Sequence, residues 1–186
     1  LVNYYADHTV FIASWLKKLN LWHKKKSNSV ILNGVNKEIF YPKKNIKQKV
    51  SRLSIVTHHW GANYLKGFDI YSNLDKLLGS KDFQKKFSFT YIGNMPKNLT
   101  FNNSKFIKPL NGKKLADEIK KHDIYLTASL NEPGGMHHIE GASCGLPLLY
   151  RNSGALPEYC GEFGIQFENK KDFLEKLLKL SVNYKQ

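Results

Sequence analysis

The sequence predicts an α/β fold in which a mostly parallel sheet carries helices on both faces. Short apolar runs of strand length alternate along the chain with amphipathic stretches of helical periodicity. This β-α-β alternation is typical of a Rossmann-like parallel sheet. The 186 residues are 41% hydrophobic and 13% aromatic, which is enough apolar material for a buried core.

The individual elements follow from apolar spacing and from residues that stop a helix. Ile70, Leu74 and Leu77 recur at helical spacing, and Gly79 follows as a stop. By the same reasoning, strands are expected over 53–57, 87–92, 105–107, 123–128, 146–150 and 164–167. Helices are expected over 68–78, 112–122, 135–144, 156–159 and 170–180. Such sheets bind ligands outside the carboxyl ends of their strands, so we expect the chemistry in the loops that follow strands.

The first forty residues stand apart from this series. They predict a strand over 10–13, a helix over 15–21 with Ser14 as its N-cap, and a strand over 30–32. A lone β-α-β unit cannot bury both of its faces. We therefore expect residues 1–42 to be the tail of an N-terminal domain with the start of a linker, and residues 43–186 to form the Rossmann-like domain.

The net charge of +14 is concentrated near the start of the chain. Residues 1–50 contribute +8, and arginine occurs only as Arg52 and Arg151. Scarce arginine argues against nucleic-acid recognition, because arginine is the side chain suited to bidentate phosphate and guanine contacts. Two interpretations remain open: a solvated lysine-rich surface, and attraction to an anionic membrane face.

Cysteine usage and hydropathy set the expected compartment. Cys144 and Cys160 have no CxxC spacing, which argues against a disulfide framework or zinc ribbon and favours a reducing compartment. No apolar run approaches the ~18 residues of a membrane span, and no signal-peptide pattern is visible at the first residues. We expect a cytoplasmic protein, peripheral to the inner face of the membrane if the basic segment binds there. The three tryptophans are expected to anchor the core or loops.

The segment over 129–141 carries the strongest chemical signal. It follows a predicted strand, and Gly134 and Gly135 leave backbone N–H groups uncovered for phosphate or sugar hydroxyls. Glu132 precedes the predicted helix and Glu140 lies about two turns inside it. This arrangement suits a ligand with hydroxyls at both ends and phosphate between them. From spacing alone, an equally good interpretation is a helix start with glutamates complementing its dipole and glycines for packing.

Several motifs in the right order resemble those of retaining GT-B glycosyltransferases of the group 1 type. The Glu132–Glu140 pair with seven intervening residues, followed by a Gly-Leu-Pro run at 145–147, resembles their E-x7-E element. The Lys66-Gly67-Phe68-Asp69 run resembles their phosphate-binding lysine loop. Weaker matches are Asn33-Gly34-Val35, Phe40-Tyr41-Pro42 and Gly154-Ala155-Leu156-Pro157-Glu158. The resemblance covers about residues 8–168.

The resemblance implies a role for each matched position. Glu140 would hold the ribose hydroxyls of a nucleotide sugar, and Glu132 would face the sugar. Lys66 would neutralise the diphosphate as it leaves, which requires no metal. The base would lie near Leu110 and Leu115. Backbone amides would contact sugar or diphosphate at Gly134, Gly135 and Met136.

The sequence departs from the family where an arginine is usual, five residues before Lys66. Gly61 stands there. We expect His59, when protonated, to replace part of the arginine's function, with Asn63 as an uncharged donor of hydrogen bonds. Alternatively, His58 and His59 only shape a longer loop. The two His-His pairs lack metal-ligand spacing, so no metal is expected.

The resulting prediction is a glycosyltransferase, with this chain as its sugar-donor-binding part and inactive alone. It would transfer a sugar from a nucleotide-diphosphate sugar to a glycan or lipid-linked acceptor, with retention of configuration. An acceptor-binding N-terminal domain is an expected partner, and polysaccharide biosynthesis is an expected context. Two alternatives stay open: a non-transferring relative, such as a sugar-nucleotide epimerase or degenerate subunit, and a basic nucleic-acid-binding module.

Overall fold

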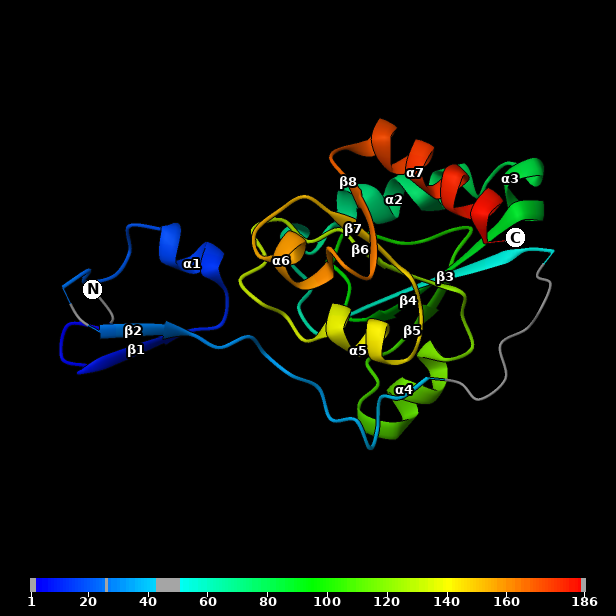
Figure 1. The fold of residues 1–186 in the computed structure, drawn as a ribbon. Coiled ribbons are helices and arrows are strands. Elements are labelled where there is room, and N and C mark those ends of the chain that lie inside the picture. The colour runs from blue at the N-terminus through cyan, green and yellow to red at the C-terminus, as the bar shows by residue number, and fades with distance from the viewer. Residues whose placement is uncertain (1–2, 26, 43–50, 185–186) are drawn as a thin grey trace.

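A six-stranded parallel sheet organises most of the chain (Figure 1). The computed structural model describes residues 3–25, 27–42 and 51–184. The strand order is β5-β4-β3-β6-β7-β8, and every neighbouring pair is parallel. The strands are β3 (Leu53–His59), β4 (Phe87–Gly93), β5 (Lys105–Ile107), β6 (Ile124–Thr127), β7 (Leu148–Arg151) and β8 (Gly164–Phe167). The predicted Rossmann-like α/β class is confirmed.

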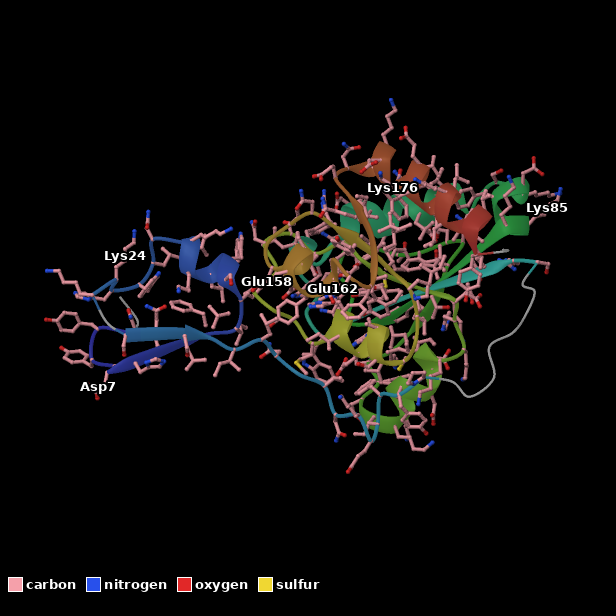
Figure 2. All side chains as sticks on the ribbon, viewed as in Figure 1. Asp7, Lys24, Lys85, Glu158, Glu162 and Lys176 are labelled. Atoms are coloured by element: carbon pink, nitrogen blue, oxygen red, sulfur yellow. The ribbon has the colours of Figure 1, made fainter. Side chains whose placement is uncertain are left out.

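Helices cover both faces of the sheet. Figure 1 shows α2, α3 and α7 on one side and α4 and α5 on the other. The helices of this domain are α2 (Phe68–Leu77), α3 (Lys81–Lys86), α4 (Gly112–Ile119), α5 (His137–Ser143), α6 (Leu156–Cys160) and α7 (Lys170–Asn183). Charged side chains such as Lys85 of α3 and Lys176 of α7 point outward (Figure 2). No helix in the described ranges is long and apolar enough to cross a membrane.

Two apolar clusters, one on each face, hold the layers together. Along β3, Ile55 belongs to the cluster under α2 and α7, whereas its neighbour Val56 belongs to the cluster under α4 and α6. This alternation follows from the two-residue period of a strand whose faces are both covered. Phe68 and Leu177 are fully buried in the first cluster. Burying each such side chain contributes about 1.5–3 kcal/mol.

A separate β-α-β unit precedes the large sheet (Figure 1). β1 (His8–Phe11) and β2 (Ser27–Val30) form a two-stranded parallel sheet joined through α1 (Ser14–Lys18). The predicted elements are present, with each strand beginning two or three residues earlier than expected. Ser14 is not the N-cap. Ala13 occupies that position, and the Ser14 N–H donates to the Glu158 carboxylate at 2.8 Å. Figure 2 shows Glu158 on the side of the domain that faces this unit.

Residues 31–42 connect the two parts without a helix or strand. Phe40 is only 6% exposed and packs into the cluster under α4 and α6. The Lys120 Nζ lies 3.3 Å from the centre of the Tyr41 ring, a cation–π contact. This connection is therefore docked against the domain as far as Tyr41. Most of the lysine-rich stretch predicted as a linker, residues 43–50, lies outside the described residues.

Three local predictions were wrong. The strand expected over 53–57 continues to His59, because the ladder with β4 extends to the pairs His58–Ile92 and His59–Gly93. The helix expected from residue 135 begins at His137, so Glu140 lies in its first turn. The short helices η1 (Tyr64–Lys66) and α3 were not predicted. Helix α3 is mostly charged and packs on the core through Phe83, so its sequence lacks an apolar period.

Candidate functional site

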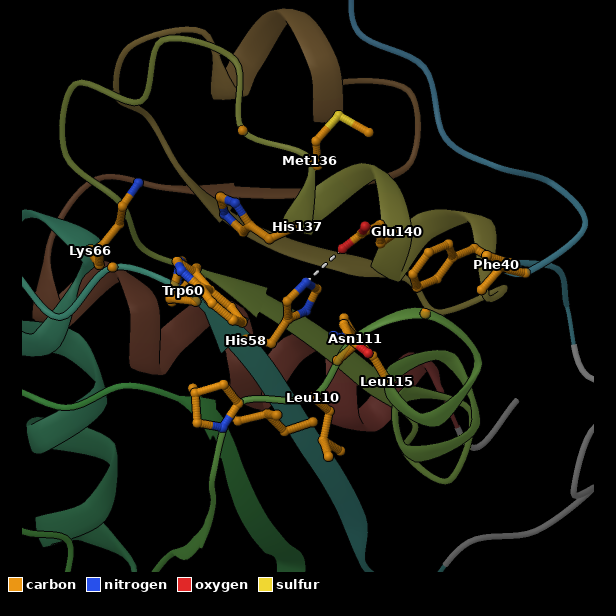
Figure 3. A pocket seen from close by; sticks show the side chains of 18 residues that line it. Phe40, His58, Trp60, Lys66, Leu110, Asn111, Leu115, Met136, His137 and Glu140 are labelled. Atoms are coloured by element: carbon orange, nitrogen blue, oxygen red, sulfur yellow. Dashed lines mark hydrogen bonds and ion pairs between the residues drawn. The ribbon is translucent and has the colours of Figure 1, made fainter.

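A cavity of about 520 Å³ lies at the carboxyl ends of β3 and β4 (Figure 3). Its floor includes His58 and His59, the last residues of β3. The loop after β5 and the start of α4 form one wall through Leu110 and Leu115, and the start of α5 forms another. Phe40 from the connecting segment closes one side. The cavity thus occupies the position where parallel α/β sheets bind their ligands.

Lys66 and Glu132 form an ion pair beside this cavity. The Lys66 Nζ lies 2.9 Å from Oε2 of Glu132, whose side chain is only 3% exposed. Lys66 ends η1, and Gly67 follows with φ of +96°, where a Cβ would lie 2.5 Å from Ala128, the residue that follows β6. Only glycine permits both this dihedral and this approach, which brings the lysine to the loop that carries Glu132. Lys66 has the only fixed positive charge among the described cavity-lining residues.

Glu140 and His58 form a second pair, on the side of the cavity opposite Lys66 (Figure 3). The His58 Nε2 lies 2.7 Å from Oε2 of Glu140, and both residues line the cavity. In the close-up of Figure 3, Lys66 and Glu140 lie on opposite sides, with His137 between them. A positively charged amine and a carboxylate thus lie at the two ends of one hollow. This arrangement matches a ligand that carries anionic groups at one end and hydroxyls at the other.

His59 and His137 are buried, uncharged groups at the base of the cavity. Burial, with smaller contributions from neighbouring histidines and Lys66, holds the pKa of both rings well below the usual value. The His59 Nε2 lies 2.7 Å from the Tyr71 hydroxyl, and the His137 Nε2 lies 2.8 Å from the Thr127 hydroxyl. The proposed replacement of arginine by a protonated His59 conflicts with this environment, because a neutral ring adds no positive charge.

The structure brings most of the predicted site residues to the cavity. Seven of them line it: His59, Lys66, Leu110, Leu115, Gly135, Met136 and Glu140. Glu132 lies directly behind the glycine loop, since a Cβ on Gly135 would be 2.9 Å from its Oε1. Asn63 is exposed and precedes η1 without lining the cavity.

Gly134 lies away from the cavity, against the N-terminal unit. Its carbonyl accepts a hydrogen bond from the Asn33 side chain at 2.5 Å. A Cβ on Gly134 would lie 3.0 Å from Ile12 and 3.2 Å from the Tyr159 hydroxyl. That hydroxyl donates to the Ile12 carbonyl and accepts from the Asn33 N–H. The N-terminal unit and the connecting segment together fix the outer half of the glycine loop.

Sequence reasoning missed several polar or aromatic residues of the cavity, among them His58 and Trp60. His58 was assigned to a loop, although it directly follows the predicted strand that ends at Thr57. Extending that strand by two residues would have placed His58 at its carboxyl end. Trp60 was expected to anchor the core or a loop, but its side chain is 72% exposed at the rim of the cavity. Its backbone carbonyl accepts from the Asn94 side chain at 2.7 Å. The ring is thus available to a ligand.

The described part of the chain holds no cluster of metal ligands. No three or more histidine, cysteine, aspartate or glutamate side chains are arranged to hold a metal ion in those ranges. The cysteines have buried thiols, and burial raises the pKa of Cys144 to about 11 and of Cys160 to about 12. They are therefore protonated and poor ligands at neutral pH.

A parallel sheet with helices on both faces and a cavity at its carboxyl edge places this protein among the Rossmann-like α/β folds. Residues 90–186 match the family of glycosyl transferases group 1, and the chain belongs to that family. No curated protein sequence matches the chain significantly.

Solved structures share the fold at low sequence identity. Sucrose-phosphate synthase from Thermosynechococcus elongatus is 17% identical with a TM-score of 0.72. The matched region covers 96% of this chain and 50% of the synthase chain. WaaG, a glycosyltransferase involved in lipopolysaccharide biosynthesis, is 13% identical with a TM-score of 0.72, covering 95% and 54%. The C-terminal domain of a glycosyl transferase group 1 family protein (LpcC) from Francisella tularensis is 20% identical with a TM-score of 0.62, covering 79% and 87%. The chain spans about half the length of the first two structures.

Proposed function

We propose that this chain is the sugar-donor-binding part of a retaining glycosyltransferase. The reaction would transfer a sugar from a nucleotide-diphosphate sugar to a glycan or lipid-linked acceptor. The observation that carries the proposal is the placement of Lys66 and Glu140 on opposite sides of one cavity at the carboxyl edge of the sheet. Membership of the glycosyl transferases group 1 family supports it.

Each side of the cavity suits one part of a nucleotide sugar. The Glu140 carboxylate is an acceptor for ribose hydroxyls, and the apolar wall of Leu110 and Leu115 fits a base. Lys66 would bind the diphosphate and stabilise the negative charge that grows on it as the sugar leaves. Phosphate oxygens would then compete with Glu132 for the Lys66 ammonium, which lies within hydrogen-bond distance of that carboxylate.

The domain division is part of the proposal. Residues 43–186 would form the donor-binding domain, and residues 1–42 would belong to an acceptor-binding domain and the start of its linker. The fold similarity to an isolated C-terminal domain, which covers 87% of that domain, supports this division. In a complete enzyme, the acceptor would approach from the side of the N-terminal unit, where Gly134 is held by Asn33.

Calorimetry with UDP, GDP, ADP and dTDP at millimolar concentration tests sugar-donor binding. We expect heat with at least one of the four. The Lys66→Ala variant should lose affinity for the diphosphate and little affinity for the matching monophosphate, because its ammonium contacts the terminal phosphate. Glu140→Ala should lose about 1.5–3 kcal/mol for each charged hydrogen bond removed. No heat with any of the four nucleotides would contradict the proposal.

A further inference from the structure

The Glu140 carboxylate is fixed by a side chain from another strand. His58 Nε2 on β3 lies 2.7 Å from Oε2 of Glu140 on α5, and the two residues are 82 positions apart in sequence (Figure 3). His58 is only 8% exposed, and the Glu140 side chain is 17% exposed. In the described ranges, no hydrogen bond engages Oε1 of Glu140. One carboxylate oxygen is therefore held by the protein, and the other is left for a ligand.

Tyr125 on β6 contacts the other nitrogen of the His58 ring. The Tyr125 hydroxyl lies 2.9 Å from the His58 Nδ1 and accepts a hydrogen bond from the His58 backbone N–H at 3.3 Å. Burial raises the pKa of Tyr125 well above its usual value, so the hydroxyl keeps its proton. We place the proton of the neutral His58 ring on Nε2, which faces the carboxylate, so that Nδ1 accepts from the Tyr125 hydroxyl. A bare Nε2 would place a lone pair against the carboxylate, which is unfavourable.

A close packing contact brings the three elements together. A Cβ on Gly141 would lie 2.3 Å from the Tyr125 ring, so only glycine allows α5 to rest directly on that ring. Glu140 precedes this glycine and is thereby held beside His58 at the end of β3. The chain of contacts runs from Tyr125 through His58 to Glu140, and each residue lies on a different regular element.

We infer that His58 is a positioning residue that orients Glu140 toward the ribose hydroxyls of the nucleotide. This inference rests on the proposed function and adds a residue to its site. The His58 N–H binds Oε2 and keeps the carboxylate from rotating, so Oε1 faces the ligand. His58 then contributes to binding only when the nucleotide has a ribose hydroxyl that donates a hydrogen bond to Glu140. A nucleotide without ribose hydroxyls gains nothing from it.

The test measures affinity for UDP, GDP and ADP beside their 2′,3′-dideoxy counterparts, using the 186-residue chain. His58→Leu removes the Nε2 hydrogen bond and should weaken binding of the preferred ribonucleotide about 10-fold to 100-fold. Its affinity for the dideoxy counterpart should stay equal to that of the unchanged protein. His58→Gln carries an amide N–H of similar reach and should restore most of the ribonucleotide affinity.

Controls separate positioning from a general structural effect. His122→Leu removes another hydrogen-bonded histidine, which is half-buried and does not line the cavity, and should not alter the ribose preference. In a double variant with Glu140→Ala, His58→Leu should cause no further loss. If His58→Leu is too unstable to measure, His58→Asn, whose shorter amide does not reach Oε2, replaces it and should show the same selective loss.

Three outcomes would overturn the inference. Equal loss for the ribonucleotide and the dideoxy nucleotide would make His58 a structural residue only. Unchanged ribonucleotide affinity in His58→Leu and His58→Asn, together with weakened affinity in Glu140→Ala, would remove His58 and leave the proposed function standing. If none of the nucleotides binds the unchanged protein, the proposed function fails, and the inference fails with it.

Discussion

The Lys66 Nζ lies 2.9 Å from Oε2 of Glu132, and the carboxylate side chain is 3% exposed whereas the lysine side chain is 27% exposed. This asymmetry determines what each partner contributes. The carboxylate has little access to water and depends on the lysine for neutralisation, whereas the lysine can turn toward the cavity it lines. The pair therefore couples the stability of the loop before α5 to the proposed phosphate-binding group.

Lys66→Ala should destabilise the fold in the absence of any ligand. Removing the lysine leaves the Glu132 carboxylate buried without a partner, and breaking a fully buried pair costs about 3–5 kcal/mol. Because Lys66 is partly exposed, we expect roughly 1–3 kcal/mol. Urea denaturation measures this change. Lys85→Ala removes one partner of an exposed pair with Asp82 and should have no measurable effect. Equal stability of the two variants would contradict the argument.

Gly141→Ala should destabilise the protein by displacing α5. The added methyl would lie 2.3 Å from the Tyr125 ring, which is fully buried and has no room to retreat. Overpacking of this kind costs about 1–3 kcal/mol. Gly34→Ala is the matched control, because a Cβ there meets nothing within 4 Å. Thermal unfolding compares the two variants, and a Gly141→Ala protein as stable as the control would refute the packing argument.

The regular elements could be predicted because their apolar residues face the core with a clear period. Ile70 and Leu74 lie on one helical face, and both are fully buried in α2. Ile124 and Leu126 of β6 likewise belong to one cluster, whereas Tyr125 belongs to the other. Helix α3 gave no such signal, because Phe83 is its single large apolar residue.

Several residues that the structure brings to the cavity were predicted, but their contacts were not. Lys66, Glu132 and Glu140 were identified by motif, yet the hydrogen bond between His58 and Glu140 joins residues 82 positions apart. That contact depends on the order β3-β6 within the sheet and on how closely α5 rests on Tyr125. The spacing of residues along the sequence predicts neither the strand order nor this close packing. The lowered pKa of His59 could likewise not be predicted, because the burial that causes it is a property of the packed sheet.

The stability of the protein should fall as the pH drops below about 6.5, partly because of His138. Burial lowers the pKa of His138 to about 4. Between these two values the unfolded chain binds a proton that the native ring does not, so stability is fully present above pH 6.5 and decreases as the pH falls toward 4. This group alone should account for roughly 2 kcal/mol between pH 7.5 and pH 5.

His138→Leu should reduce that pH dependence. Both ring nitrogens of His138 are buried without a hydrogen-bond partner in the described part of the chain, so the substitution removes an unsatisfied polar group. At pH 7.5 we expect equal or higher stability than in the unchanged protein, and at pH 5 a clear gain. Urea denaturation at both pH values gives the comparison. The same loss between the two pH values in both proteins would contradict the assignment.

Trp60 should report ligand binding at the cavity. Its side chain is 72% exposed at the rim, so a nucleotide that enters beside it changes its surroundings and its fluorescence emission. We expect a concentration-dependent emission change with the nucleoside diphosphate that gives heat in calorimetry. Trp60→Phe should lose this change and keep its unfolding free energy within about 0.5 kcal/mol, because exposed substitutions are usually mild. An emission change that persists in Trp60→Phe would place the reporter at Trp15 or Trp22, and hence away from this cavity.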